Sequence, residues 1–213
     1  SPFLGPDYQG LRECSDTVLA WRRRREWERR SSQPELNAAG MLIYPDRCGN
    51  ICCEQKTLRR TMKQELLDTK FMGEAITEAR KASLAGEVPV GAVVVLGDEI
   101  IARAYNCKES DGDPTAHAEI LAIREAARHV GVWRLSGATI YVTLEPCPMC
   151  AGAIVQARLD RLVYGAADPK TGAAGTIFDI PRDLRLNHWV NVTGGVMSEE
   201  AGALLEEFFA NRR

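Results

Sequence analysis

Apolar and polar positions follow a regular period only from about residue 69 onward. Residues 1–68 show no sustained period of two or of 3.6, and they carry the charged run WRRRREWERR. A segment without either period has no apolar face to bury, so we expect a poorly ordered N-terminal extension there. The methionines Met62 and Met72 offer alternative starts, so this extension need not be native. Residues 69–213 are predicted to form one folded domain.

The second part of the chain alternates between helical and extended patterns. Apolar residues at helical spacing predict a first helix over 71–85, which ends before Gly86 and Pro89. Two extended runs flank Gly97 and Asp98 and predict a hairpin. The remaining predicted elements are a helix at 117–130 opened by Pro114 and Thr115 and followed by Gly131, a strand at 138–145, a helix at 146–157, a strand at 161–165, a last strand at 188–196, and a helix from 198 that is capped by Ser198.

The order of these elements restricts the fold. A strand, a helix and a second strand in succession predict a parallel crossover, whereas the hairpin adds antiparallel pairing. The strand at 138–145 is rich in β-branched and aromatic residues, which indicates burial. We therefore predict an α/β fold, a three-layer α/β/α sandwich around a mixed sheet of about five strands.

Composition narrows the class of protein. The 213 residues, 45% of them hydrophobic, suit a globular domain with an appendage. The chain has no apolar stretch of about 18 residues and no signal-peptide pattern, so we expect a cytoplasmic protein without a membrane partner. A net charge of −2 argues against a strongly basic, nonspecific nucleic-acid binder but allows a local basic groove. The seven unevenly spaced cysteines argue against a disulfide framework and favour metal binding or redox chemistry.

Two short motifs, each at the start of a predicted helix, carry the candidate chemistry. The first is His117-Ala118-Glu119, and the second is Pro146-Cys147-Pro148-Met149-Cys150. Two cysteines three apart across a helix N-terminus can present both sulfurs to one ion, and the exposed N–H groups there favour thiolates. His117, Cys147 and Cys150 are therefore candidate ligands of zinc, and three protein ligands leave one position for water. Glu119 is the candidate base that takes the proton of that water.

The cysteines and histidines also allow other interpretations. A CxxC after a strand is also typical of a thiol-disulfide oxidoreductase, but His-x-Glu followed by Pro-Cys-x-x-Cys matches the signature of zinc-dependent nucleobase deaminases. The remaining cysteines and histidines are expected to be bystanders or structural residues: Cys48, Cys52, Cys53, Cys107, His129 and His188.

Several longer stretches resemble the bacterial tRNA-specific adenosine deaminases, which convert adenosine to inosine at the wobble position (34) of tRNA. The similarity spans about residues 69–213. The matching stretches are EVPVGAVVV at 87–95, Asn106, DPTAHAE at 113–119, YVTLEPCPMCAGA at 141–153, DPKTGAAG at 168–175 and the final EEFFANRR.

This resemblance implies a cytidine-deaminase-like fold, a homodimer, and one zinc ion per subunit at His117, Cys147 and Cys150. It implies that Glu119 shuttles protons and that no organic cofactor takes part. It implies a tRNA anticodon stem-loop as substrate, with the target base splayed out of its loop. Substrate contacts are expected from Asn106, Asp168 and Lys170, with Val88 and Pro89 beside the base.

Two alternatives remain open at this point. DPTAHAE followed by PCPMC also resembles deaminases of a free nucleobase such as guanine. A noncatalytic subunit could keep the zinc site as a structural element, although a base beside an open metal position argues against it. If the substrate is RNA, its contacts are expected from local basic residues, namely Arg158, Arg161, Lys170, Arg182, Arg212 and Arg213.

Overall fold

The computed structural model describes residues 35–36, 42–43 and 50–212, and the chain divides into two compact units, residues 1–59 and 60–213. In the first unit, β1 (Glu35–Leu36) pairs antiparallel with β2 (Leu42–Ile43). The arginine-rich run at 21–30 and Cys48 lie outside the described residues. None of the helices in the described part of the chain is long and apolar enough to cross a membrane.

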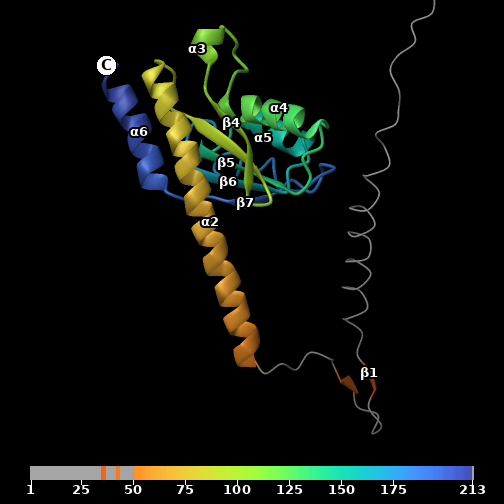
Figure 1. Cartoon of the computed structure of the whole chain (residues 1–213). Helices are drawn as coiled ribbons and strands as arrows, with labels where there is room; N and C mark the ends of the chain where they lie inside the picture. The colour runs from red at the N-terminus through yellow and green to blue at the C-terminus, as the bar shows by residue number, and fades with distance from the viewer. Residues whose placement is uncertain (1–34, 37–41, 44–49, 213) are drawn as a thin grey trace, which may run out of the picture. The chain divides into compact units, whose positions relative to one another are not determined.

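A five-stranded mixed sheet forms the centre of the second unit (Figure 1). Its strands run in the order β4-β3-β5-β6-β7, with β3 antiparallel to both β4 and β5 and with β5, β6 and β7 parallel. The strands are β3 (Gly91–Leu96), β4 (Glu99–Tyr105), β5 (Ala138–Leu144), β6 (Arg161–Ala166) and β7 (Asn191–Thr193). The mixed sheet and its predicted hairpin are confirmed.

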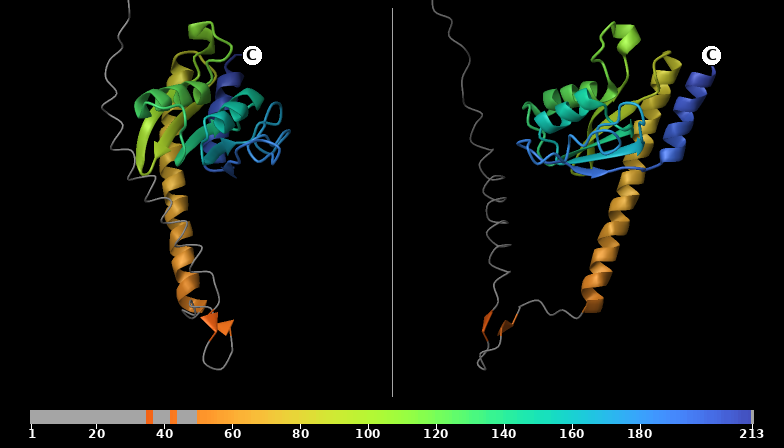
Figure 2. Two further views of the ribbon diagram at one scale, coloured as in Figure 1. Left: turned by 90° about the vertical axis from the view of Figure 1, so that its right-hand side faces the viewer. Right: turned by 180° about the vertical axis from the view of Figure 1, so that it is seen from behind.

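Helices cover both faces of this sheet. On one face lie α4 (Ala118–Val130) and α5 (Pro148–Gln156); on the other lie α6 (Ser198–Ala210) and the part of α2 (Asn50–Leu84) that belongs to this unit (Figure 2). Alternate residues of β3 explain the two layers, because Ala92 and Val94 are buried toward α4 whereas Val93 and Val95 pack against α2. The predicted three-layer sandwich is therefore confirmed.

Helix α2 begins at Asn50, well before the start that the apolar period predicts. Its early turns contain good helix formers such as Gln, Lys, Arg and Leu. However, Leu58, Met62 and Leu66 are 59–71% exposed, so residues 58–66 bury no apolar stripe. Periodicity detects a helix through the face it buries, and for that reason it missed these turns.

Asp68 connects α2 to the sheet. Its carboxylate accepts two hydrogen bonds from the Arg161 guanidinium, at 2.6 and 2.7 Å, and a third from the Tyr141 hydroxyl at 3.0 Å. Arg161 also donates to Thr193 on β7. Arg161 was predicted as an RNA contact, but it is mostly buried in this ion pair, so that assignment was wrong.

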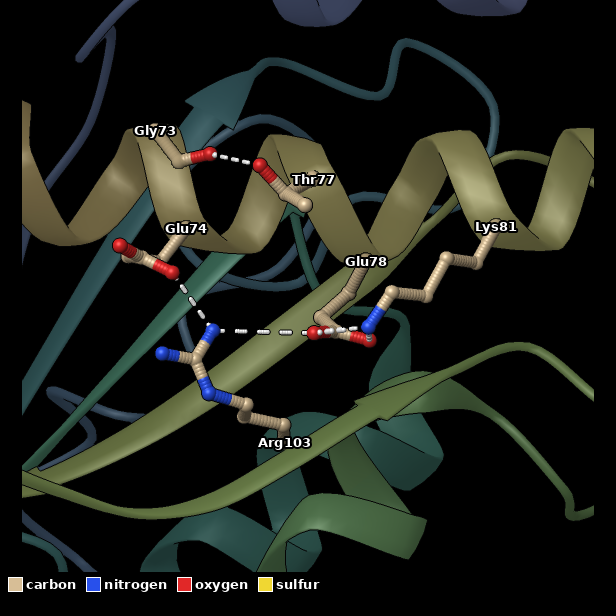
Figure 3. Close-up of polar contacts among 6 residues, drawn as sticks. All are labelled: Gly73, Glu74, Thr77, Glu78, Lys81 and Arg103. Carbon is tan, nitrogen blue, oxygen red and sulfur yellow. Dashed lines mark hydrogen bonds and ion pairs between the residues drawn. The ribbon is translucent and has the colours of Figure 1, made fainter.

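A second ion-pair cluster connects α2 to the edge strand β4 (Figure 3). The Arg103 guanidinium lies 2.6 Å from the Glu74 carboxylate and 3.7 Å from that of Glu78. Glu78 is buried and also binds the Lys81 ammonium at 2.8 Å. All of these contacts lie between α2 and β4 or within α2.

Three local predictions need correction. α4 begins at Ala118, one residue after the predicted start, and its N-cap is His117, so Pro114 and Thr115 do not cap it. α6 is preceded by Met197 in the left-handed region (φ 53°), without a side-chain cap from Ser198. The last strand is shorter than predicted, and a short helix, α3 (Lys108–Asp111), was not predicted because four residues are too few to show a period. The predicted glycine after α4 is confirmed, because Gly131 (φ 78°) closes that helix.

Candidate active site

Two helix N-termini carry the three candidate ligands. His117 is the N-cap of α4, and Cys147 is the N-cap of α5; both have extended backbone conformations. Cys150 lies in the first turn of α5, which begins with Pro148. Since unpaired N–H groups of a first turn favour negative charge, the position of Cys147 at the start of α5 favours its thiolate form.

The ligand atoms of these three residues converge. The His117 Nδ1 atom lies 3.8 Å from Cys147 Sγ and 3.5 Å from Cys150 Sγ, and all three atoms lie within 4.8 Å of one another. In a tetrahedral zinc site, with Zn–S of about 2.3 Å and Zn–N of about 2.0 Å, such N–S pairs are about 3.5 Å apart. The donor set and its spacing therefore fit a tetrahedral metal ion with one position left over.

The two thiols have different pKa values because they share a hydrogen bond. The pKa of Cys147 is lowered to about 4, mainly because Cys150 donates to its sulfur and secondarily because His117 does. The pKa of Cys150 is raised by donating that bond and by burial. The pKa of His117 is raised mainly by its hydrogen bond to Cys147.

Glu119, in the first turn of α4, is buried beside these ligands. Its side chain is 3% exposed, and burial raises its pKa. Among the described residues, its Oε2 atom is the only buried side-chain nitrogen or oxygen without a hydrogen-bond partner. Since a buried polar atom without a partner is costly, this oxygen is suited to a water or a ligand entering the site.

A hollow of about 140 Å³ opens onto His117, Cys147 and Glu119. It is small beside the roughly 300 Å³ or more of a pocket for a drug-sized molecule, so it suits one base-sized group. Its other lining residues are Val88, Val90, Asn106, Lys108, Leu144, Glu145, Asp168 and Thr171.

The structure brings some of the predicted substrate residues to this hollow and not others. Asn106, Asp168 and Val88 line it. Pro89 is buried next to Val88 but is not part of the lining. Lys170 lines a separate hollow against α6.

Asn106 and Asp168 also have structural partners. The Asn106 Oδ1 atom accepts the N–H of Ala118 at 2.9 Å, which holds the start of α4. The Asp168 carboxylate accepts the N–H groups of Lys170 and Thr171 and the Thr171 hydroxyl. Asp168 therefore organises its own turn, and this use of its oxygens was not visible in the sequence.

Five lining residues were missed by the sequence analysis: Val90, Lys108, Leu144, Glu145 and Thr171. The sequence did contain a signal that could have placed Glu145 in the site, because it stands directly before Pro146-Cys147 in the matched stretch YVTLEPCPMCAGA. Lys108 had none, because it lies on the unpredicted helix α3.

The other cysteines and histidines stay outside the site wherever they are described. His188 contacts the carbonyl oxygen of Leu159 through Nε2 at 2.7 Å, and the Cys107 thiol donates to the carbonyl of Tyr105. Within residues 58–212, whose side chains are described, His117, Cys147 and Cys150 form the one cluster suited to a metal.

Comparison with known proteins agrees with this arrangement. Residues 67–213 match the family described as MafB19-like deaminase. The tRNA-specific adenosine deaminase of Bacillus subtilis (strain 168) is 53% identical over 146 residues, which cover 68% of this chain and 91% of that protein. The matched residues 67–213 include every residue of the hollow.

Two solved structures have similar folds. One, from a study of A-to-I editing by tRNA:A34 deaminases, has a TM-score of 0.62 at 47% identity and covers 64% of this chain and 99% of its own. The other, a guanine deaminase from Nitrosomonas europaea, has a TM-score of 0.59 at 25% identity and covers 67% and 84%. The sequence identity to these proteins and the arrangement of His117, Cys147 and Cys150 indicate the same family. The chain belongs to the family of tRNA-specific adenosine deaminases in the cytidine deaminase superfamily.

Proposed function

We propose that this protein hydrolyses adenosine to inosine at the wobble position of tRNA, releasing ammonia. One observation carries the proposal: three metal-ligating atoms and the unpaired Oε2 of Glu119 meet at a hollow of base size. Family membership and the similarity to an A34 deaminase support the choice of substrate.

His117, Cys147 and Cys150 would hold one zinc ion per subunit. A histidine nitrogen and two thiolates are typical zinc donors, and their spacing fits a tetrahedral ion. Bound there, zinc supplies a fourth position for the attacking water and lowers the pKa of that water.

Glu119 would move the protons. Its Oε2 atom has no protein partner to displace, so it can accept one proton from the attacking water and pass it to the ring nitrogen. It can then accept the second proton of that water, from the hydroxyl now bonded to the ring carbon, and pass it to the departing amine. One carboxylate thus serves as base and acid, and the net reaction consumes one water and releases one ammonia. A noncatalytic subunit would not require this unpaired buried carboxylate.

The hollow would bind the target base. Asn106 and Asp168 would contact the substrate, and Val88 supplies an apolar wall beside the ring. Pro89 and Lys170 stay predictions that have no place in the lining. Since the hollow admits about one base, the adenosine has to leave its stack, which costs least in a single-stranded anticodon loop. We also propose a homodimer and a cytoplasmic location, both on the family resemblance.

Incubation of the zinc-loaded protein with a tRNA anticodon stem-loop, followed by sequencing, tests this function. We expect inosine at the wobble adenosine and none in a matched stem-loop whose adenosine is moved along the loop. The guanine deaminase similarity supplies the competing substrate, so free guanine is assayed in parallel. Activity on guanine alone would replace the proposed function with free-base deamination.

A further inference from the structure

We infer that Glu145 is a positioning residue, which holds the 168–176 loop so that this loop forms one wall of the base pocket. The inference rests on the proposed function for its substrate but on hydrogen-bond geometry for its mechanism. Glu145 directly follows β5 and directly precedes the Pro146-Cys147 pair.

Glu145 is buried, and the loop occupies both of its oxygens. Its Oε1 atom accepts the N–H groups of Ala174, at 3.0 Å, and Thr176, at 3.1 Å. Its Oε2 atom accepts the N–H of Asp168, at 3.1 Å, and the Thr176 hydroxyl. Four donors on one carboxylate leave little capacity for a substrate.

These bonds continue to the surface of the hollow. The Oε2 atom of Glu145 fixes the backbone of Asp168, and the Asp168 carboxylate in turn fixes Thr171. Both Asp168 and Thr171 line the hollow. Displacement of the loop from Glu145 would therefore move two lining residues without altering the metal ligands.

Gly172 shows how closely the loop packs on this carboxylate. A Cβ atom at this position would lie 2.4 Å from Glu145 Oε2 and 2.5 Å from the Asp168 carbonyl oxygen. Its φ angle is outside the left-handed region, so alanine adds no φ strain, and its cost comes from these two overlaps. Gly172→Ala should thus push the loop away from Glu145 through a change in the loop itself, with the carboxylate left intact.

The test compares Glu145→Gln and Gly172→Ala with wild type in hydrogen exchange of the zinc-loaded protein. A glutamine amide has one acceptor oxygen, so at least one backbone N–H among Asp168, Ala174 and Thr176 loses its partner. We expect faster exchange in this loop and unchanged zinc content in both variants. Unchanged exchange, or loss of zinc, would overturn the inference whether or not the protein deaminates tRNA.

Kinetics on the anticodon stem-loop supply the second measurement. We expect KM to rise about tenfold in both variants while kcat changes by less than about twofold, because binding and not proton transfer is disturbed. A fall in kcat at constant KM would make Glu145 a catalytic residue instead. If the wild type forms no inosine, the proposed function fails, and the exchange measurement still decides whether Glu145 holds the loop.

Glu78→Gln is the matched control. Glu78 is equally buried and charged, but its partners are Lys81 and Arg103 on the α2 and β4 side, away from the lining of the hollow (Figure 3). This change should leave KM and loop exchange at their wild-type values. A comparable rise in KM would show that any buried glutamate has this effect and would overturn the specific role of Glu145.

Discussion

Two glutamates line the same hollow with opposite surroundings. Glu119 has an oxygen with no partner, whereas the oxygens of Glu145 accept four hydrogen bonds. A carboxylate with an open lone pair can exchange a proton with a substrate, while one with all its oxygens occupied stabilises structure. The difference between a chemical and a positioning role is therefore decided by the partners of each side chain.

Glu119→Gln tests the chemical role at this scale. The amide keeps the size of the side chain but cannot accept a proton, so we expect kcat to fall by about 10²- to 10⁴-fold. Metal content and stem-loop affinity should stay at wild-type values, because neither depends on this carboxylate. Metal analysis, a binding titration and the inosine assay measure the three quantities, and undiminished turnover would refute the assignment.

The Asp68–Arg161 pair connects three elements of the fold: α2, β6 and, through Thr193, β7. Burial alone would raise the pKa of Asp68, but hydrogen bonds from Arg161 and Gln64 and the charge of Arg161 outweigh it, so the pKa is lowered. A carboxyl group with a lower pKa in the folded state binds protons better when unfolded. The pair therefore stabilises the fold above the unfolded pKa of about 3.9, and this stabilisation is lost as pH falls through the folded pKa.

Asp68→Asn should lower the free energy of unfolding at pH 7 by about 3 kcal/mol, because it leaves Arg161 mostly buried without its counter-charge. Urea unfolding across pH 3 to 7 measures this difference, which should shrink toward the acid end. Asp98→Asn is the control, since Asp98 is exposed in a turn that asparagine also suits. A difference independent of pH would contradict the electrostatic account.

In the whole molecule, the site depends on where the three layers place the helix starts. α4 and α5 lie on one face of the sheet, and their N-termini meet where β5 ends. The loop after β6 closes the hollow from the side. Ligands from two helices and a wall from a third segment can thus surround one base.

The domain boundary is also decided by the whole molecule. The predicted boundary at 68/69 would separate Asp68 from Arg161, whereas the compact unit begins at residue 60. We expect a 60–213 fragment to keep the wild-type melting temperature of the deaminase domain, and a 69–213 fragment to melt about 10 °C lower. Calorimetry on both fragments measures this. Equal melting temperatures would support the boundary at 68/69.

The sequence by itself determined the alternation of helices and strands, the mixed sheet and the two helix starts that carry the three candidate ligands. These features depend on periods and motifs that extend over a few residues, so local chemistry specifies them. Glu119 was also expected beside His117, because only Ala118 separates the two residues at the start of one helix.

Only the tertiary structure decided how the polar side chains are used. Asp68 and Arg161 are 93 residues apart, and Glu145 binds a loop that begins 23 residues later. Such pairs form because packing of the three layers brings distant segments together and buried charges need partners. In the same packing, the Asp168 carboxylate accepts hydrogen bonds from its own loop, and Lys170 lines a different hollow. No local sequence pattern encodes either arrangement.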